Sequence, residues 1–147
     1  MKIRGVDKSD IVHLFEWRND SLTRHMSKNS NKVTYEEHKK WFEYSLTNPL
    51  RKMYIGITEE ERVGICRFDL DKIMTSSEVT INLNPIMRGK NLSYDLLFNS
   101  IKIYKKENQV SFTATIKKEN RISLKIFEKY GFLTFSEDDE FYYLRAL

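Results

Sequence analysis

The fold is decided by residues 78–93, which read EVTINLNPIMRGKNLS. Polar and apolar side chains alternate through residues 78–84, and this two-residue period predicts a β-strand. Pro85 and Gly89 then mark a turn. Residues 91–106 carry apolar side chains at helical spacing, and residues 110–116 again resemble a strand. The stretch therefore predicts a strand–helix–strand unit whose two strands are parallel.

The remaining elements follow on either side of this unit. Thr34 and Glu37 form a capping-box pattern that opens a helix, and Asn120 is a good N-cap for the last helix, which Gly131 ends. The other expected elements are strand 3–6, helix 9–17 and strands 52–57, 62–70, 132–135 and 141–144. This order predicts a single α/β domain over residues 1–147, with helices on both faces of a mixed sheet.

The amino-acid composition limits the classes of protein to which this chain can belong. Hydrophobic residues make up 40% of the 147 residues, enough for a packed core. The single cysteine, Cys66, excludes an internal disulfide and a cysteine-cluster metal site, so we expect no metal and a reduced, cytoplasmic setting. We expect no membrane association, because neither a signal peptide nor an apolar run of the roughly 20 residues that span a bilayer is visible.

The charges argue against a nucleic-acid-binding surface. The chain has 25 basic and 21 acidic residues, a net charge of +4, and the two signs are interleaved almost everywhere. Such a pattern is typical of a mixed solvated surface. A local basic site for a phosphorylated small molecule remains open.

The turn at residues 83–93 is the first candidate for such a site. Small residues between a strand and a helix let several backbone N–H groups converge, and the helix N-terminus adds about half a positive charge. Arg88 and Lys90 add to this potential. The alternative is an ordinary basic turn that only caps a helix.

Two stretches together indicate a family. Residues 88–93 read RGKNLS, and the last helix carries Asn120, Ser123 and, at residues 127–132, FEKYGF. These resemble the two motifs of the GNAT superfamily of N-acetyltransferases, and the resemblance covers essentially the whole chain. It implies a mostly antiparallel seven-stranded sheet with a splayed central strand pair. It also implies acetyl-CoA as the cofactor and direct acetyl transfer to a primary amine.

The resemblance also implies which residues hold the cofactor. The turn would bind its pyrophosphate, the strand before the turn would pair with its pantetheine arm, and the last helix would flank its thioester. The residues concerned are Leu83, Asn84, Arg88, Gly89, Lys90, Asn91, Leu92, Ser93, Asn120 and Phe127. A backbone N–H near Leu83 or Asn84 would polarise the carbonyl oxygen.

The sequence departs from the family pattern at two places. Asn91 and Ser93 stand where the family usually has glycine or alanine, although asparagine tolerates a positive φ better than most residues. Phe127 stands where many members have a tyrosine that protonates the leaving thiolate. Either Tyr130, about one turn further on, supplies this proton, or water or the substrate does, in which case Tyr130 has a packing role.

A general base is needed because only the neutral amine attacks. Glu78, at the start of the strand before the turn, is the first candidate, and Asp69 on the preceding strand is the second. The alternative for both is a solvated carboxylate at a strand end.

The N-terminal part concerns the acceptor. Its Trp-Arg-Asn element resembles the subgroup of the family that acetylates nucleotide-linked amino sugars, and similar elements occur in ribosomal-protein acetyltransferases. An arginine pair suits a diphosphate, whereas tryptophans and a histidine on an apolar face are often core residues. The predicted acceptor-binding residues are Trp17, Arg18, Asn19, Arg24 and His38.

We therefore predict an N-acetyltransferase that acts on a small-molecule amine, with the primary amine of a nucleotide-linked amino sugar as the first candidate. A protein N-acetyltransferase of the ribosomal-protein type and a non-catalytic coenzyme A-binding module are the alternatives. No nucleic-acid partner is expected, and a homodimer is left open.

Overall fold

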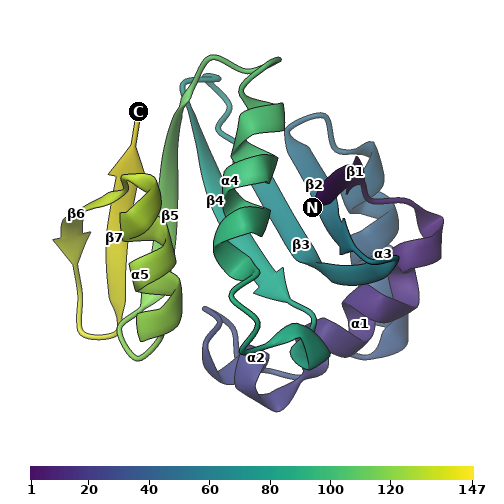
Figure 1. Cartoon of the computed structure of the whole chain (residues 1–147). Coiled ribbons are helices and arrows are strands. Elements are labelled where there is room, and N and C mark those ends of the chain that lie inside the picture. Colours follow the sequence, from purple (N-terminus) through teal and green to yellow (C-terminus); the bar gives the residue numbers. More distant parts are fainter.

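The computed structural model describes all 147 residues. It contains a seven-stranded sheet of order β1-β2-β3-β4-β5-β7-β6, with helices on both faces (Figure 1). The strands are β1 (Lys2–Gly5), β2 (Arg51–Thr58), β3 (Glu61–Leu70), β4 (Ser76–Leu83), β5 (Ser111–Lys117), β6 (Leu133–Glu137) and β7 (Phe141–Ala146). The α-helices are α1 (Ile11–Asn19), α2 (Ser21–His25), α3 (Tyr35–Thr47), α4 (Ser93–Tyr104) and α5 (Arg121–Tyr130), with 3₁₀ turns at Lys8–Asp10 and Pro85–Met87.

The sheet is mixed and mostly antiparallel, as predicted. Only β4 and β5 are parallel, and α4 connects them. Their pairing covers three register pairs, Ser76–Glu78 against Ser111–Thr113, and the strands diverge beyond residue 78. The predicted splayed central pair is therefore confirmed.

Two apolar cores lie on opposite faces of the sheet, because side chains alternate along each strand. On one face, Cys66 and Val79 pack with α4 and α5. On the other face, Ile55 and Ile65 pack with α1 and α3. Burial raises the pKa of the Cys66 thiol to about 12, so this thiol is an inert core group.

Local sequence signals account for most of the helix ends. Thr34 and Glu37 form the predicted capping box of α3, and the Asn120 side chain accepts a hydrogen bond from the Ser123 N–H at the start of α5. Helix α2 was not predicted. Five residues are too few for a visible period, but the Asp20 carboxylate accepts from the Thr23 N–H and so begins this helix.

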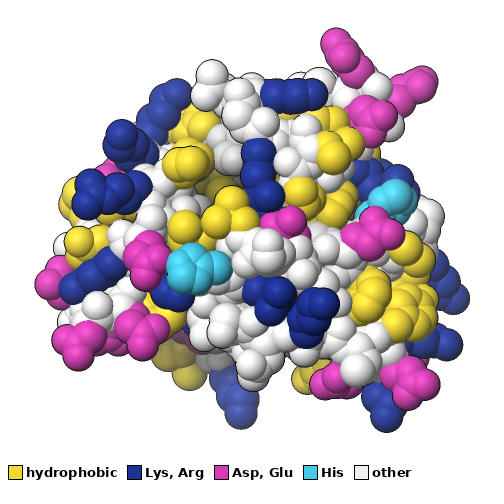
Figure 2. Space-filling view, turned by 90° about the horizontal axis from the view of Figure 1, so that it is seen from below, with side chains coloured by type: hydrophobic (Ala, Val, Ile, Leu, Met, Phe, Trp, Pro, Cys, Tyr) yellow, Lys and Arg dark blue, Asp and Glu magenta, His cyan; other side chains and the backbone are white.

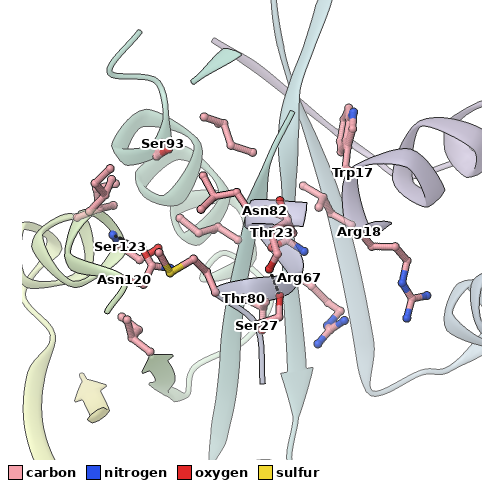
Figure 3. Close-up of a pocket in the computed structure, with 18 of the residues that line it drawn as sticks. Trp17, Arg18, Thr23, Ser27, Arg67, Thr80, Asn82, Ser93, Asn120 and Ser123 are labelled. Atoms are coloured by element: carbon pink, nitrogen blue, oxygen red, sulfur yellow. Dashed lines mark hydrogen bonds between the residues drawn. The ribbon is translucent and has the colours of Figure 1, made fainter. Parts of the chain in front are cut away.

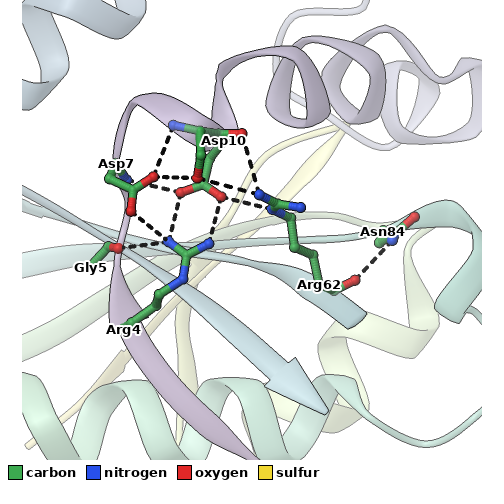
Figure 4. Close-up of polar contacts among 7 residues, drawn as sticks. Arg4, Gly5, Asp7, Asp10, Arg62 and Asn84 are labelled. Carbon is green, nitrogen blue, oxygen red and sulfur yellow. Dashed lines mark hydrogen bonds and ion pairs between the residues drawn. The ribbon is translucent and has the colours of Figure 1, made fainter. Parts of the chain in front are cut away.

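A buried carboxylate anchors the start of α1 (Figure 4). Asp10 is fully buried and accepts two hydrogen bonds of 2.8 Å from Arg4 and one of 2.8 Å from Arg62. Burial by itself would raise the pKa of Asp10, but hydrogen bonds from Arg4, the Asp7 N–H and Arg62 outweigh it and lower the pKa to about 2. The Arg62 carbonyl accepts from the Asn84 side chain, so the network reaches the end of β4.

Acidic and basic side chains are interspersed on the face shown in Figure 2, in keeping with the charge pattern of the sequence. None of the helices is both long and apolar enough to span a bilayer.

Candidate active site

The divergence of β4 and β5 opens a cavity of about 850 Å³. Its lining comes from α1, α2, the segment after α2, strands β3 to β5, the turn before α4, the first residues of α4, and α5, with Trp41 of α3 and Phe141 of β7. In Figure 3, Ser93, Asn120 and Ser123 lie on one side, Trp17 and Arg18 lie on the other, and Thr80, Asn82 and Arg67 of the sheet lie between them. The cavity thus connects the turn at residues 88–93 with the N-terminal helices.

Ten of the predicted site residues line this cavity: Trp17, Arg18, Leu83, Arg88, Gly89, Asn91, Leu92, Ser93, Asn120 and Phe127. The other eight lie outside its lining: Asn19, Arg24, His38, Asp69, Glu78, Asn84, Lys90 and Tyr130.

The exposed edge of β4 offers backbone donors to a ligand. The Asn84 N–H donates to the Val63 carbonyl at 2.8 Å, in register with the β3–β4 ladder. Hydrogen-bond direction alternates along an antiparallel ladder, so the N–H groups of Ile81 and Leu83 point away from β3, toward the side where β5 has diverged. An amide-containing chain can pair with this edge. Of the two predicted oxyanion donors, the Leu83 N–H faces this side and the Asn84 N–H is bonded within the sheet.

The turn before α4 is built to expose backbone N–H groups. Gly89 and Asn91 have φ values of 76° and 57°, so an asparagine here adopts the left-handed conformation that the family's glycine would adopt. The first residues of α4 have no side-chain cap, and the first intrahelical bond runs from the Leu96 N–H to the Leu92 carbonyl. The preceding N–H groups, including that of Ser93, are available to an anion.

Arg88 has a partner within the protein. Its guanidinium donates to the carboxylate of Asp20 and, at 3.1 Å, to the Thr23 hydroxyl. It therefore joins the anion-binding turn to the start of α2. Lys90 is exposed and lies beside the cavity rather than in its lining.

The wall opposite β4 comes from β5 and α5. Asn120 uses its Oδ1 atom to cap α5, so its Nδ2 amide is the group left for a ligand. Phe127 is 2% exposed and makes an edge-on contact with Phe132, with 5.0 Å between the ring centroids. Tyr130 packs against Phe98 and Phe132, outside the cavity lining.

The two candidate bases have different surroundings. Glu78 lies where β4 and β5 part, and its Oε2 atom accepts from Thr115 at 3.0 Å and from Lys28 at 2.9 Å. Asp69 accepts from Arg51 at 2.6 Å and from Arg67 at 3.0 Å. Both oxygens of Asp69 are taken up by guanidinium groups, whereas Glu78 contacts Lys28 and Thr115, two residues of the cavity lining, so the geometry favours Glu78 as the candidate.

Cations and an indole gather at the end of the cavity formed by the N-terminal helices. The guanidinium carbons of Arg18, Arg51 and Arg67 lie 4.8, 5.7 and 5.9 Å from the centre of the Trp41 ring. Loss of solvation, and then the charge of Arg67, lower the pKa of Arg18. Trp17 is only 4% exposed and forms part of the wall.

Three of the predicted acceptor-binding residues instead hold the local structure. Asn19 bonds both the N–H and the carbonyl of Val33, which secures the segment after α2. Arg24 donates to the carbonyls of Asn19 and Ser30. His38 of α3 is fully buried and contacts Arg18 and Ile11 of α1.

Sequence reasoning missed Lys28, Arg67 and Thr115. Their positions depend on strand register and on the path of the chain after α2, neither of which leaves a local pattern. Arg67 had one signal, since it is a cation between Cys66 and Phe68 in an apolar strand.

Comparisons with known proteins agree with this geometry. Residues 1–133 match the family model described as "Acetyltransferase (GNAT) domain". The chain is 26% identical to "Acetyltransferase PseH" of Campylobacter jejuni over 142 residues, which cover 95% of this chain and 87% of that protein.

Solved structures show the same fold. The complex of that PseH with acetyl coenzyme A has a TM-score of 0.77 at 21% identity, covering 99% of this chain and 96% of the other. Spermidine N-acetyltransferase of Vibrio cholerae, with CoA and spermine, has a TM-score of 0.88 at 13% identity, covering 99% and 94%. Ribosomal-protein-alanine N-acetyltransferase of Brucella melitensis has a TM-score of 0.82 at 17% identity, covering 100% and 99%.

The family model spans most of the chain, and the splayed strands, the exposed β4 edge and the backbone N–H groups of the turn at residues 88–93 suit the cofactor of that family. The chain therefore belongs to the GNAT family and is an acyltransferase that uses acetyl-CoA.

Proposed function

We propose that this enzyme acetylates the primary amine of a nucleotide-linked amino sugar. The observation that carries the proposal is the excess of positive charge at the end of the cavity formed by the N-terminal helices, where the acceptor would bind. Arg18, Arg51 and Arg67 surround Trp41, and Asp69 is the carboxylate that pairs with two of them. Arg18 and Arg67 of this group line the cavity, and two guanidinium groups suit the two negative charges of a diphosphate diester.

The same charges disfavour a polyamine acceptor. A polycation placed near Arg18 and Arg67 would meet like charges in a partly desolvated site, where repulsion is strong. The resemblance of the Trp-Arg-Asn element to the amino-sugar subgroup supports the sugar nucleotide as well.

Residues of the chain can be assigned to the cofactor. The N–H groups at residues 89–93 would hold its pyrophosphate, the β4 edge at Ile81 and Leu83 would pair with its pantetheine arm, and Asn120 would bind that arm from the opposite wall. Acetyl-CoA supplies the activated acetyl group as a thioester. The Leu83 N–H is the donor available to the oxygen that becomes negative during transfer.

Glu78 is the general base in this proposal. Its carboxylate lies next to the cavity, in contact with the lining residues Lys28 and Thr115, and accepts the proton of the acceptor ammonium, directly or through water. Phe127 has no hydroxyl, so the chain supplies no phenol from that position to the leaving thiolate, and water or the acceptor provides this proton.

A thiol-release assay tests the proposal. The purified enzyme is supplied with acetyl-CoA and a panel of UDP-linked amino sugars, polyamines and N-terminal peptides of ribosomal proteins. Turnover highest with the sugar nucleotides supports the proposal. Faster turnover of a peptide would favour a protein N-acetyltransferase of the ribosomal-protein type. Thiol release that no amine increases would favour a non-catalytic coenzyme A-binding module.

A further inference from the structure

The buried ring of His38 has an assignable protonation state. Its Nε2 atom lies 2.9 Å from the Ile11 carbonyl oxygen, which can only accept, so Nε2 carries the proton. In the neutral ring, Nδ1 then presents a lone pair. Arg18 Nη1, which can only donate, lies 3.2 Å from this Nδ1 atom. The neutral tautomer therefore satisfies both neighbours at once.

Arg18 depends on this contact for its orientation. Its guanidinium stacks over Trp41 at 4.8 Å, and the His38 ring stacks against the same indole with an interplanar angle of 27°. Asp69 is already bonded to Arg51 and Arg67, and His38 is the side chain to which Arg18 donates. Arg18 lines the cavity, so its remaining N–H groups are available to a ligand.

We propose that His38 is a positioning residue, which in its neutral form holds the Arg18 guanidinium for the anionic part of the acceptor and on protonation releases it. The proposal rests on the proposed function in one respect, because it takes the acceptor's anion to lie at Arg18. In this proposal His38 does not contact the substrate. Because protonation of His38 releases Arg18, the affinity for anionic acceptors should decrease in mild acid.

Protonation reverses the fit between the two side chains. A proton on Nδ1 directs a donor at a donor and places an imidazolium against a guanidinium. The charged groups around the pair are Arg51 of β2, Arg67 and Asp69 of β3, and Glu37 of α3. Burial, and after it the charge of Arg18, lower the pKa of His38 from its usual 6.5, so the neutral form prevails at neutral pH.

Two substitutions separate positioning from packing. His38→Asn keeps an acceptor near the position of Nδ1 and loses the donor to Ile11, whereas His38→Gln keeps a donor near the position of Nε2 and loses the acceptor for Arg18. Both variants lose the ring, and neither has a group at residue 38 that titrates near neutral pH. A purely structural histidine would make the two variants alike in their effect on the acceptor.

The first experiment measures binding by calorimetry on protein saturated with coenzyme A. The probe is UDP-N-acetylglucosamine, whose diphosphate has no group that titrates near neutral pH and whose amine is already acetylated. We expect His38→Gln to weaken binding at neutral pH by about tenfold, or ~1.4 kcal/mol, and His38→Asn to stay within about threefold of wild type. Wild-type affinity should fall by a similar factor on acidification, and the affinity of His38→Asn should not.

A second readout needs no ligand. Nitrogen NMR of the His38 ring should show the Nε2-protonated tautomer, and the pKa of His38 should rise in Arg18→Met, because a neighbouring cation is removed. An unchanged pKa in this variant would overturn the proposed contact.

The remaining outcomes are also decisive. Equal affinities of the two His38 variants, or a wild-type affinity that does not change with pH, would overturn the positioning role. Absence of probe binding to the wild type at neutral pH would overturn the anion assignment of Arg18. Probe binding as expected, together with no turnover of any amino-sugar nucleotide, would overturn the proposed function alone.

Discussion

The Nζ atom of Lys28 lies 2.9 Å from Oε2 of Glu78, fifty residues further along the chain. Thr115 of β5 donates to the same oxygen at 3.0 Å. A lysine ammonium from the segment after α2 therefore contacts the carboxylate at the point where β4 and β5 part. An acceptor ammonium that uses this carboxylate has to displace Lys28 or bind the other oxygen.

Glu78→Gln should lower turnover by about 10²-fold, because a neutral amide accepts no proton from the acceptor ammonium. Coenzyme A affinity should be retained, since Glu78 lies outside the cavity lining. Raising the pH should restore part of the rate, as free amine becomes abundant. Steady-state kinetics and calorimetry check both points, and Glu43→Gln on the exposed face of α3 is the matched control. Wild-type turnover in Glu78→Gln would move the base to Asp69 or to solvent.

Lys28→Met removes the ammonium that competes with the acceptor and keeps most of the apolar stem. Lys28 and Glu78 are partly exposed, and such a pair contributes only about 0.2–1 kcal/mol. The KM for the amine should accordingly fall by about two- to fivefold, with the KM for acetyl-CoA unchanged. Lys39→Met on the exposed face of α3 serves as the control. A raised amine KM in Lys28→Met would instead mean that Lys28 binds the acceptor.

Asn91→Pro should reduce coenzyme A affinity by at least about tenfold, or ~1.4 kcal/mol. Proline requires a φ near −65°, whereas Asn91 has a φ of 57°, and proline also removes a backbone donor from the turn. Asn91→Gly is the matched control, because glycine adopts this φ without strain and should keep the affinity. Calorimetry measures the coenzyme A affinity of both variants, and circular dichroism verifies that they are folded. Equal affinities of the two variants would refute the placement of the pyrophosphate.

Tyr130→Phe should leave turnover within about twofold of wild type, because the Tyr130 ring packs on Phe98 and Phe132 outside the cavity lining. A loss of tenfold or more would assign its hydroxyl as the proton donor to the thiolate. Phe127→Tyr is the complementary variant, since Phe127 lines the cavity. A gain in turnover there would indicate that the wild type works without an efficient acid.

Asp10 should make stability depend on pH in acid. The pKa of Asp10 in the folded protein is about 2, below its ordinary value of 3.8, so the unfolded chain binds more protons. The stabilisation is present above about pH 4, is lost as the pH falls toward 2, and amounts to about 2 kcal/mol. Urea unfolding of wild type and Asp10→Asn across this pH range measures this stabilisation.

Asp10→Asn should be less stable by about 3 kcal/mol at neutral pH, because Arg4 and Arg62 lose their partner. The difference between the two proteins should shrink in acid, and a constant difference would contradict the assigned pKa.

Much of the fold could be predicted because its signals are local. The alternation before the turn, the capping box at Thr34 and the N-cap at Asn120 depend on residues within a few positions of one another, and the structure confirms each of them. The parallel strand–helix–strand unit followed from the same patterns. Helix α2 escaped prediction because its single turn is stabilised by the Asp20 side chain rather than by a repeated pattern.

The order of the elements apart from α2, the turn before α4 and, through two motifs, the family could be predicted from the sequence alone. These features depend on backbone propensity and on short spacings, which the order of residues contains directly. The tertiary structure was needed to show that Asp69 is engaged by two arginines, that Lys28 contacts Glu78 and that Arg18 contacts His38. Each of these contacts joins residues on different elements. Strand register and helix packing bring them together, and those depend on the summed burial of the whole core rather than on any one stretch of the chain.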